Sequence, residues 1–227
     1  MKLCLSTFAC LAFLSLSGFA AIGDVTNIQF KAGTDGLYSG SGVAGGSTLW
    51  NPFTGSSGTS MLDLPTSDGT ASSVDFTATY MSRFGGATTS STSASVLLRN
   101  GLYGTVSFTF SDLNPLDTFS LYVYVGNKAE TVTTVSITTP GGGSQTPSPV
   151  MNQSSFAIDN NYVVFSGLTP DASRQLSGSV TSSWTALNGL QLQTTGIPEP
   201  GSAMLLGGGL LLLLGGKPMR RNAQSQI

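Results

Sequence analysis

The sequence feature that most constrains the fold is a regular alternation of apolar and polar residues in the middle of the chain. Phe108 and Phe110 alternate with Ser107 and Thr109, and the segment 119–125 shows the same pattern. Successive side chains of a strand point to opposite faces of a sheet, so a period of two predicts half-buried β-strands.

Seven further segments have strand-like sequences, and Gly, Pro, Asn and Ser turns separate them. No long amphipathic helix is expected between the two ends of the chain. Nine short strands predict an all-β domain over residues 21–195, an antiparallel β-sandwich or jelly roll. The seven segments are 25–30, 74–80, 95–99, 131–138, 162–165, 175–181 and 186–193.

The first 20 residues predict a signal peptide, and therefore an exported protein. Lys2 precedes the apolar run 3–16, and the small residues Gly18 and Ala20 are spaced as a cleavage site. Cleavage is expected after Ala20. The alternative is an uncleaved anchor helix, which the short run with its interrupting serine and threonine residues disfavours.

Composition excludes several classes of chemistry. Only 9% of the 227 residues are charged, so serine, threonine, asparagine and glycine must supply the polar surface. The chain has no histidine, and its two cysteines, Cys4 and Cys10, both lie in the signal peptide. The mature protein therefore has no disulfide, no thiolate nucleophile, no Ser-His-Asp triad and no cysteine or histidine metal ligand.

The C-terminal region predicts a membrane-spanning helix over about residues 201–216. Sixteen uncharged residues span about 24 Å as a helix, so flanking side chains must help to cross the bilayer. The basic residues Lys217, Arg220 and Arg221 follow and are expected to stay cytoplasmic together with residues 222–227. A generic tail anchor is one alternative. A buried core helix is another, which the three consecutive glycines 207–209 disfavour.

The residues Pro198, Glu199 and Pro200 precede this helix, and the tail as a whole covers 196–221. Tripeptide, apolar helix and basic cluster in this order resemble the PEP-CTERM sorting signal of Gram-negative bacteria. The resemblance implies processing by an exosortase, a membrane-embedded transpeptidase, and delivery from the inner membrane to the cell surface or to exopolysaccharide. Two departures are that Pro218 and Met219 split the basic cluster, and that six residues follow it.

The two prolines also have a direct physical meaning. They hold Glu199 in an extended, donor-poor segment that a protease can bind as a strand. Alternatively, they mark the start of the helix, with Glu199 favourable at the positive end of the helix dipole. The two interpretations are compatible.

The central domain carries a second resemblance. Trp50-Asn51, the segment 108–115 and the segment 187–192 are similar in order to PEP-CTERM passenger domains with a galactose-binding-like jelly roll. The resemblance covers about residues 25–193. It implies contact with carbohydrate or matrix and supplies no list of binding residues.

Acidic residues offer limited chemistry. The segment 21–197 contains ten acidic and five basic residues, which disfavours nucleic-acid binding. Asp63, Asp68 and Asp75 cluster in a loop-rich stretch, where an oxygen-only calcium site is the alternative to ordinary turn residues. We favour turn residues and expect neither a metal nor another cofactor. No pair of acids is distinguished as the two carboxylates of a glycosidase.

Aromatic side chains are the better candidates for sugar contact. Trp50, Tyr122, Tyr124 and Trp184 stack on a sugar only if they are exposed. Tyr122 and Tyr124 share a strand face opposite the apolar residues, so they lie either on a wet face or beneath a neighbouring loop. For each of the four, packing within the domain is the alternative and the favoured interpretation.

Two functions of different classes follow. The first is a non-enzymatic cell-surface or matrix protein, sorted by its tail, that binds polysaccharide or forms part of the envelope. The second is a secreted hydrolase of polysaccharide sorted in the same way. The missing histidine and cysteine and the lack of a distinguished acid pair favour the first.

Overall fold

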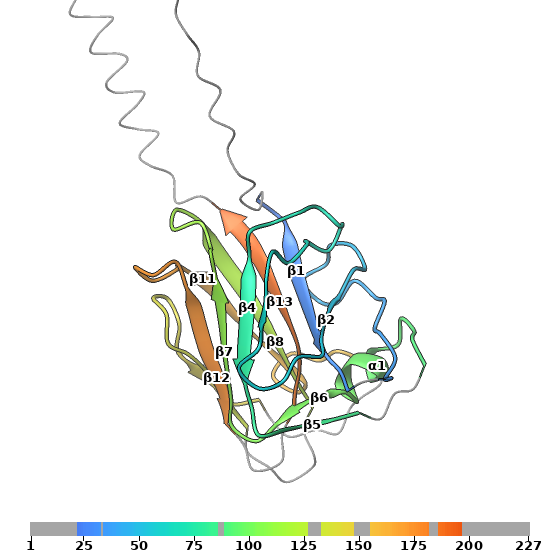
Figure 1. The fold of residues 1–227 in the computed structure, drawn as a ribbon. Helices are drawn as coiled ribbons and strands as arrows, with labels where there is room; N and C mark the ends of the chain where they lie inside the picture. Colours follow the sequence, from blue (N-terminus) through green and yellow to red (C-terminus); the bar gives the residue numbers. More distant parts are fainter. Residues whose placement is uncertain are drawn as a thin grey trace, which may run out of the picture.

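A computed structural model describes residues 22–32, 34–85, 89–126, 133–147, 155–181 and 186–196. Two β-sheets face each other, and one short helix lies beside them (Figure 1). The predicted all-β sandwich is therefore confirmed. The predicted signal helix and the predicted membrane helix at 201–216 lie outside the described residues. Within the described ranges, no helix has the length and apolarity needed to cross a membrane.

The first sheet has seven strands, with the continuous order β11, β8, β13, β1, β2. Strand β6 also pairs with β13, and β5 pairs with β6. All of these neighbours are antiparallel except β1 and β2, which are parallel. The strands are β1 (Val25–Phe30), β2 (Asn51–Phe53), β5 (Ser82–Phe84), β6 (Gly101–Tyr103), β8 (Thr118–Gly126), β11 (Tyr162–Leu168) and β13 (Ala186–Gly196).

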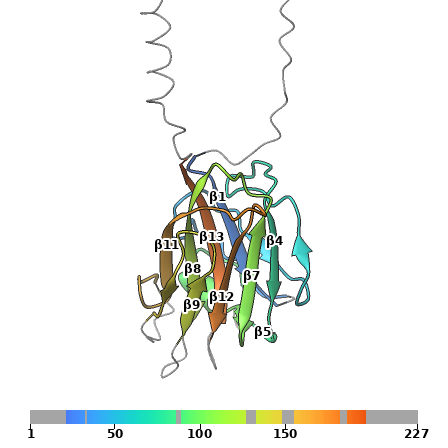
Figure 2. The same ribbon diagram turned by 90° about the vertical axis from the view of Figure 1, so that its left-hand side faces the viewer.

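The second sheet has six strands in the order β10, β9, β12, β7, β4, β3. Every pair in it is antiparallel, and Figure 2 shows β9, β12, β7 and β4 side by side. The strands are β3 (Ser60–Met61), β4 (Asp75–Thr79), β7 (Val106–Ser111), β9 (Thr134–Ile137), β10 (Ser144–Gln145) and β12 (Leu176–Thr181).

The main core lies between the two sheets and contains the apolar half of the alternating pattern. Phe108 and Phe110 of β7 face Leu121 and Val123 of β8 across it, all at most 2% exposed. Aromatic rings meet within it, as for Phe76 and Phe110, whose centroids are 5.1 Å apart. The apolar residues of the alternating pattern in β7 and β8 are therefore the ones that form the core, as the sequence predicts.

The segment 95–99 is a helix and not the expected strand. Helix α1 (Ala94–Leu98) begins after Ser93, whose hydroxyl accepts a hydrogen bond from the Ser95 amide, a common N-cap arrangement. Three consecutive side chains, Val96, Leu97 and Leu98, are buried. Such a short apolar run is ambiguous between helix and strand, and the serine cap and the packing partners decide in favour of the helix.

A second cluster of buried residues covers the outer face of the first sheet. It combines Tyr124 of β8 with four residues of helix α1 and with Tyr38 and Trp50 from the segment before β2. Phe156 packs at its margin, 5.0 Å from the Tyr124 ring. Part of the first sheet is thus buried on both faces, whereas the outer face of the second sheet carries half-buried and exposed residues.

Candidate functional site

Several residues singled out in the sequence lie outside the described part of the chain. They are the cleavage residue Ala20, the sorting motif Pro198, Glu199 and Pro200, the basic residues Lys217, Arg220 and Arg221, and the aromatic residue Trp184. Their roles stay predictions.

A buried polar network holds the segment 36–49 against the first sheet. Gln191 is its centre: its amide nitrogen donates to Asn27 Oδ1 (2.8 Å) and to the carbonyl of Ser41 (2.9 Å). Its amide oxygen accepts from the Ala44 amide (2.9 Å) and from the Tyr124 hydroxyl. All four donors and acceptors are matched, which is the condition for burying an amide side chain at low cost.

Two further contacts extend this network along β1. Asn27 donates to the carbonyl of Leu49 (2.9 Å), and Gln29 Oε1 accepts from the Tyr38 amide (2.8 Å). Gln29 also donates to the carbonyl of Gly36 (3.2 Å). The polar residues of β1 therefore bind a covering segment and do not face solvent.

The aromatic candidates Trp50 and Tyr124 belong to this covered region. Trp50 is 3% exposed and Tyr124 is 0% exposed, so neither ring presents a face to a sugar. Trp50 donates its indole N–H to the carbonyl of Gly40 (2.7 Å) and packs edge-on against Tyr38. The sugar-stacking hypothesis is corrected for these two residues, and packing beneath a neighbouring loop, its alternative, is confirmed.

The tyrosines of β8 have different surroundings. Burial raises the pKa of Tyr124, so its hydroxyl stays protonated; it accepts from the Val43 amide (2.7 Å) while donating to Gln191. Tyr122 is half-buried, and its hydroxyl donates to Gln193 Oε1 (3.3 Å). Tyr122 is thus the one candidate among the three described aromatic residues that keeps partial exposure.

The acidic candidates form turns. Asp68 Oδ1 accepts from the Thr66 hydroxyl (2.6 Å) and from the Thr70 amide (2.9 Å). These bonds, led by the one from Thr66, lower the pKa of Asp68 to about 2. The Asp63 amide donates to Asp75 Oδ1 (2.9 Å), and Asp63 has a positive φ of 50°. The Asp68 bonds stabilise a turn, and the Asp75 bond connects residue 63 to the first residue of β4. No group of three or more acidic residues in the described ranges is arranged to hold a metal ion.

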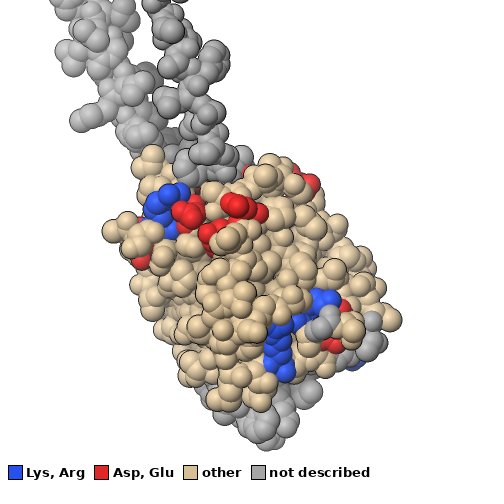
Figure 3. Space-filling model, viewed as in Figure 1, with Lys and Arg blue, Asp and Glu red and all other residues tan. Residues whose placement is uncertain are grey.

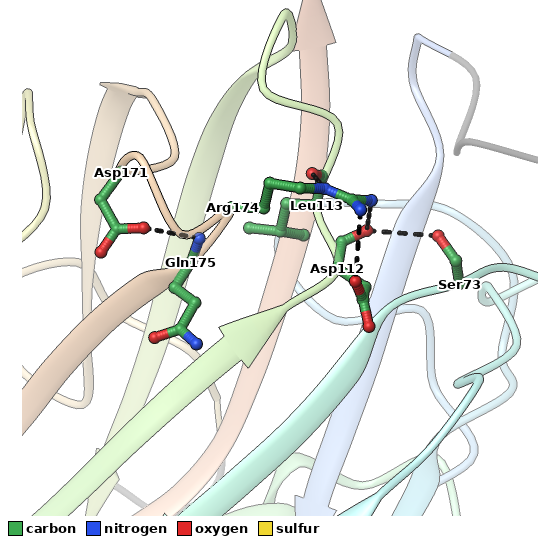
Figure 4. Close-up of polar contacts among 6 residues, drawn as sticks. All are labelled: Ser73, Asp112, Leu113, Asp171, Arg174 and Gln175. Carbon is green, nitrogen blue, oxygen red and sulfur yellow. Dashed lines mark hydrogen bonds and ion pairs between the residues drawn. The ribbon is translucent and has the colours of Figure 1, made fainter.

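Charged side chains are visible near the two ends of the face shown in Figure 3, with an uncharged band between them. At one end, Arg174 bonds the turn that follows β7, as Figure 4 shows. Its guanidinium lies 3.4 Å from the Asp112 carboxylate and donates to the carbonyls of Leu113 (3.0 Å) and Asp112 (3.2 Å). Both side chains are about half exposed, so the ion pair itself contributes little to stability.

The open face of the second sheet carries two rows of hydroxyl side chains, which we call the hydroxyl face. One row crosses β3, β4, β7, β12 and the residue after β9; the other crosses β4, β7, β12, β9 and β10. Every position in these rows is serine or threonine. The first row is Ser60, Thr77, Thr109, Ser177 and Thr138, and the second is Thr79, Ser107, Ser179, Ser136 and Ser144.

Neighbouring hydroxyls in these rows pair with one another. Ser60 and Thr77 are 2.7 Å apart, Thr109 and Ser177 are 3.0 Å apart, and Ser136 and Ser144 are 2.8 Å apart. Hydroxyl pairs directly opposite each other on adjacent strands are a known source of sheet stabilisation. Sequence reasoning did not identify this site, although its signal is present as hydroxyl residues at alternate positions of four strands.

The two ends of the described domain lie together. Val25 pairs with Gln193 in the antiparallel ladder, the Gly23 amide donates to the Thr194 carbonyl (2.7 Å), and the Thr194 amide donates to the Asp24 carbonyl (3.0 Å). Figure 1 shows the start of β1 and the end of β13 at the same end of the sandwich. The first and last described residues of the domain therefore lie at the same end of the sandwich.

Comparison with known proteins gives no match: no family model, no curated protein and no solved structure matches this chain. The functional argument therefore depends on the residues themselves.

Proposed function

We propose that the chain is an exported protein that an exosortase sorts, through its C-terminal tail, to the cell surface or extracellular matrix. In this proposal the sandwich is a non-enzymatic passenger domain that contacts polysaccharide. The inner membrane holds the chain during sorting, with the domain on the periplasmic side.

The observation that carries the proposal is the side-by-side position of the two ends of the domain. A signal peptide and a tail that both engage the same membrane are easily accommodated by a domain whose first and last strands begin and end on one side. The pairing of Val25 with Gln193 gives the domain this arrangement. The order of tripeptide, apolar helix and basic cluster supports it from the sequence.

For the fold we propose the finer description as a jelly roll of the galactose-binding-like kind. Pairing of the first strand β1 with the last strand β13 supports it. So do the connections from β7 onward, which repeatedly cross from one sheet to the other. A solved structure of the chain with the same strand order tests this description.

Among the described residues, no specific contact favours the alternative of a secreted hydrolase. Burial raises the pKa of Asp117, as a catalytic acid requires, yet its carboxylate accepts from Asn114 Nδ2 (3.0 Å) inside a closed turn and is 3% exposed. Reducing-sugar release from a polysaccharide, abolished by changing a single aspartate, would establish the hydrolase instead.

Sorting is tested by replacing Pro198, Glu199 and Pro200 together with alanine and following the tagged protein through cell fractions. Surface delivery should be lost, while a control with Asn222, Gln224 and Gln226 changed to alanine should be delivered normally. Mass spectrometry of the mature wild-type protein should find a C-terminus near Pro200. An intact Ile227 on surface protein would defeat the sorting proposal.

A further inference from the structure

We propose that the hydroxyl face binds a neutral polysaccharide chain that lies across the strands of the second sheet. This inference depends on the proposed function and gives it a site and a substrate class. It differs from the aromatic hypothesis because its residues are serine and threonine and lie on the opposite side of the sandwich from Trp50 and Tyr124.

The residue types on the hydroxyl face indicate which class of partner it can bind. Its ten side chains include no charged, aromatic or large aliphatic residue. Protein interfaces depend on buried aromatic, aliphatic or arginine anchors, and nucleic acids and anionic lipids require lysine and arginine. A neutral polymer with many hydroxyl groups needs none of these.

The hydrogen-bonding capacity of the hydroxyl face also matches that of a sugar. A hydroxyl is both donor and acceptor, so a pair that shares one hydrogen bond keeps a free O–H and several lone pairs. Three such pairs lie on the face, at Ser60–Thr77, Thr109–Ser177 and Ser136–Ser144. In the described part of the chain, the hydroxyls of Thr79, Ser107 and Ser179 form no hydrogen bond, although they stand next to one another in the second row. Sugar hydroxyls have the same dual character.

The arrangement is regular and rigid. Strands lie about 4.8 Å apart, and residues on one face of a strand repeat about every 6.8 Å, so the two rows offer repeated positions to a repeating polymer. Beneath them, Phe108, Val180 and Val135 pack into the main core at no more than 2% exposure. The hydroxyls are therefore held in place before any ligand arrives, which reduces the entropic cost of binding.

Binding is expected to be weak for one chain segment and stronger for a long polymer. Each hydrogen bond replaces bonds to water, so its net contribution is small. A polymer that presents many copies of the same unit raises the effective concentration at the face. This suits a protein that stays within a matrix of such chains.

The test uses the full chain purified in detergent and native gels that contain hydroxyethyl cellulose or dextran, with alginate as the charged comparison. The wild type should be retarded by at least one of the neutral polymers. The variant Thr79→Val/Ser107→Ala/Ser179→Ala should bind that polymer about fivefold more weakly or worse. Its melting temperature should not change, because those three hydroxyls form no hydrogen bond within the described ranges.

A matched control changes one threonine and two serines that are exposed elsewhere: Thr48→Val, Ser39→Ala and Ser56→Ala. It should bind as the wild type does. If the triple variant at Thr79, Ser107 and Ser179 (the face variant) bound the polymer as tightly as the wild type, the inference would be overturned. It would also be overturned if neither neutral polymer retarded the wild type. Self-association of the wild type that the face variant loses would also overturn it and identify a second copy as the occupant. None of these outcomes alters the fractionation or the C-terminal mass, which test sorting separately.

Discussion

The side-chain amides of Gln191 and Asn27 are joined by a 2.8 Å hydrogen bond between β13 and β1, and both residues are 0% exposed. The bond connects the last strand of the domain to the first beneath the segment 36–49. It is the centre of a polar network in a place where the alternating pattern would suggest solvent.

Replacing Gln191 with leucine should lower the free energy of unfolding by about 3 kcal/mol, because several buried partners lose their hydrogen bonds at once. These include the Ala44 amide and the Tyr124 hydroxyl. Urea denaturation measures the change. The control Gln193→Leu, on the same face of the strand but half-buried, should cost under about 1 kcal/mol. Equal losses in the two variants would contradict the network.

Trp50 is predicted to act in packing. Trp50→Ala should destabilise the domain by about 3–5 kcal/mol, because it leaves a cavity beside Tyr38 and Tyr124. Trp50→Phe should cost less and leave polysaccharide retardation unchanged. Loss of retardation at full stability would show instead that the indole contacts the ligand.

Any side chain larger than a hydrogen at Gly178, in the middle of β12, is predicted to destabilise the domain. A Cβ there would lie 2.6 Å from both Ile137 Cδ1 and Phe108 Cζ, so Gly178→Ala must displace core side chains. We expect a loss of about 1–3 kcal/mol in a denaturation experiment. Gly143→Ala, where nothing lies within 4 Å of the added carbon, is the control and should have little effect.

Asp117 predicts a pH dependence of stability. Burial raises its pKa above the ordinary value, so the folded protein binds the proton more tightly than the unfolded chain does. Stability from this group is therefore present at pH below the unfolded value of 3.8 and is lost as pH rises through the folded pKa.

Asp117→Asn removes this titration and keeps an oxygen that accepts from Asn114. The melting temperature of the variant relative to the wild type should be higher at pH 7 than at pH 3. An equal difference at both pH values would mean that the carboxyl does not titrate in this way.

Asp68 separates the turn interpretation from calcium binding. Asp68→Ala removes the acceptor for Thr66 and Thr70 and should lower the urea midpoint, whether or not calcium is added. Addition of EDTA to the wild type should leave its melting temperature unchanged. A calcium-dependent rise in melting temperature that Asp68→Ala abolishes would favour the metal site.

The strands could be predicted where one face is apolar and the other polar. Strand β1 matches its predicted range of 25–30, and β4, β8 and β12 differ from theirs by one residue at one or both ends. Strands β2, β3, β5, β6 and β10 were not predicted, because two or three residues carry no periodicity.

The covering of the first sheet could not be predicted from periodicity. Asn27, Gln29 and Gln191 alternate with apolar residues as a wet face would, yet the carbonyls and amides of a distant segment satisfy them. The hydroxyl face has the same local pattern but lacks such a cover in the described ranges. Whether such a polar face is covered or exposed depends on the path of the connecting segments, which the local pattern of a strand does not reveal. Export and sorting stay predictions.

The position of β13 has a consequence for the order of folding. Among the described strands it is the last to be synthesised, yet it lies between β8 and β1 and pairs with both in antiparallel fashion. A nascent chain that ends before Ala186 therefore has a divided first sheet, with β1 and β8 unable to join. The first sheet is therefore complete only after the eleven residues of β13 have been synthesised.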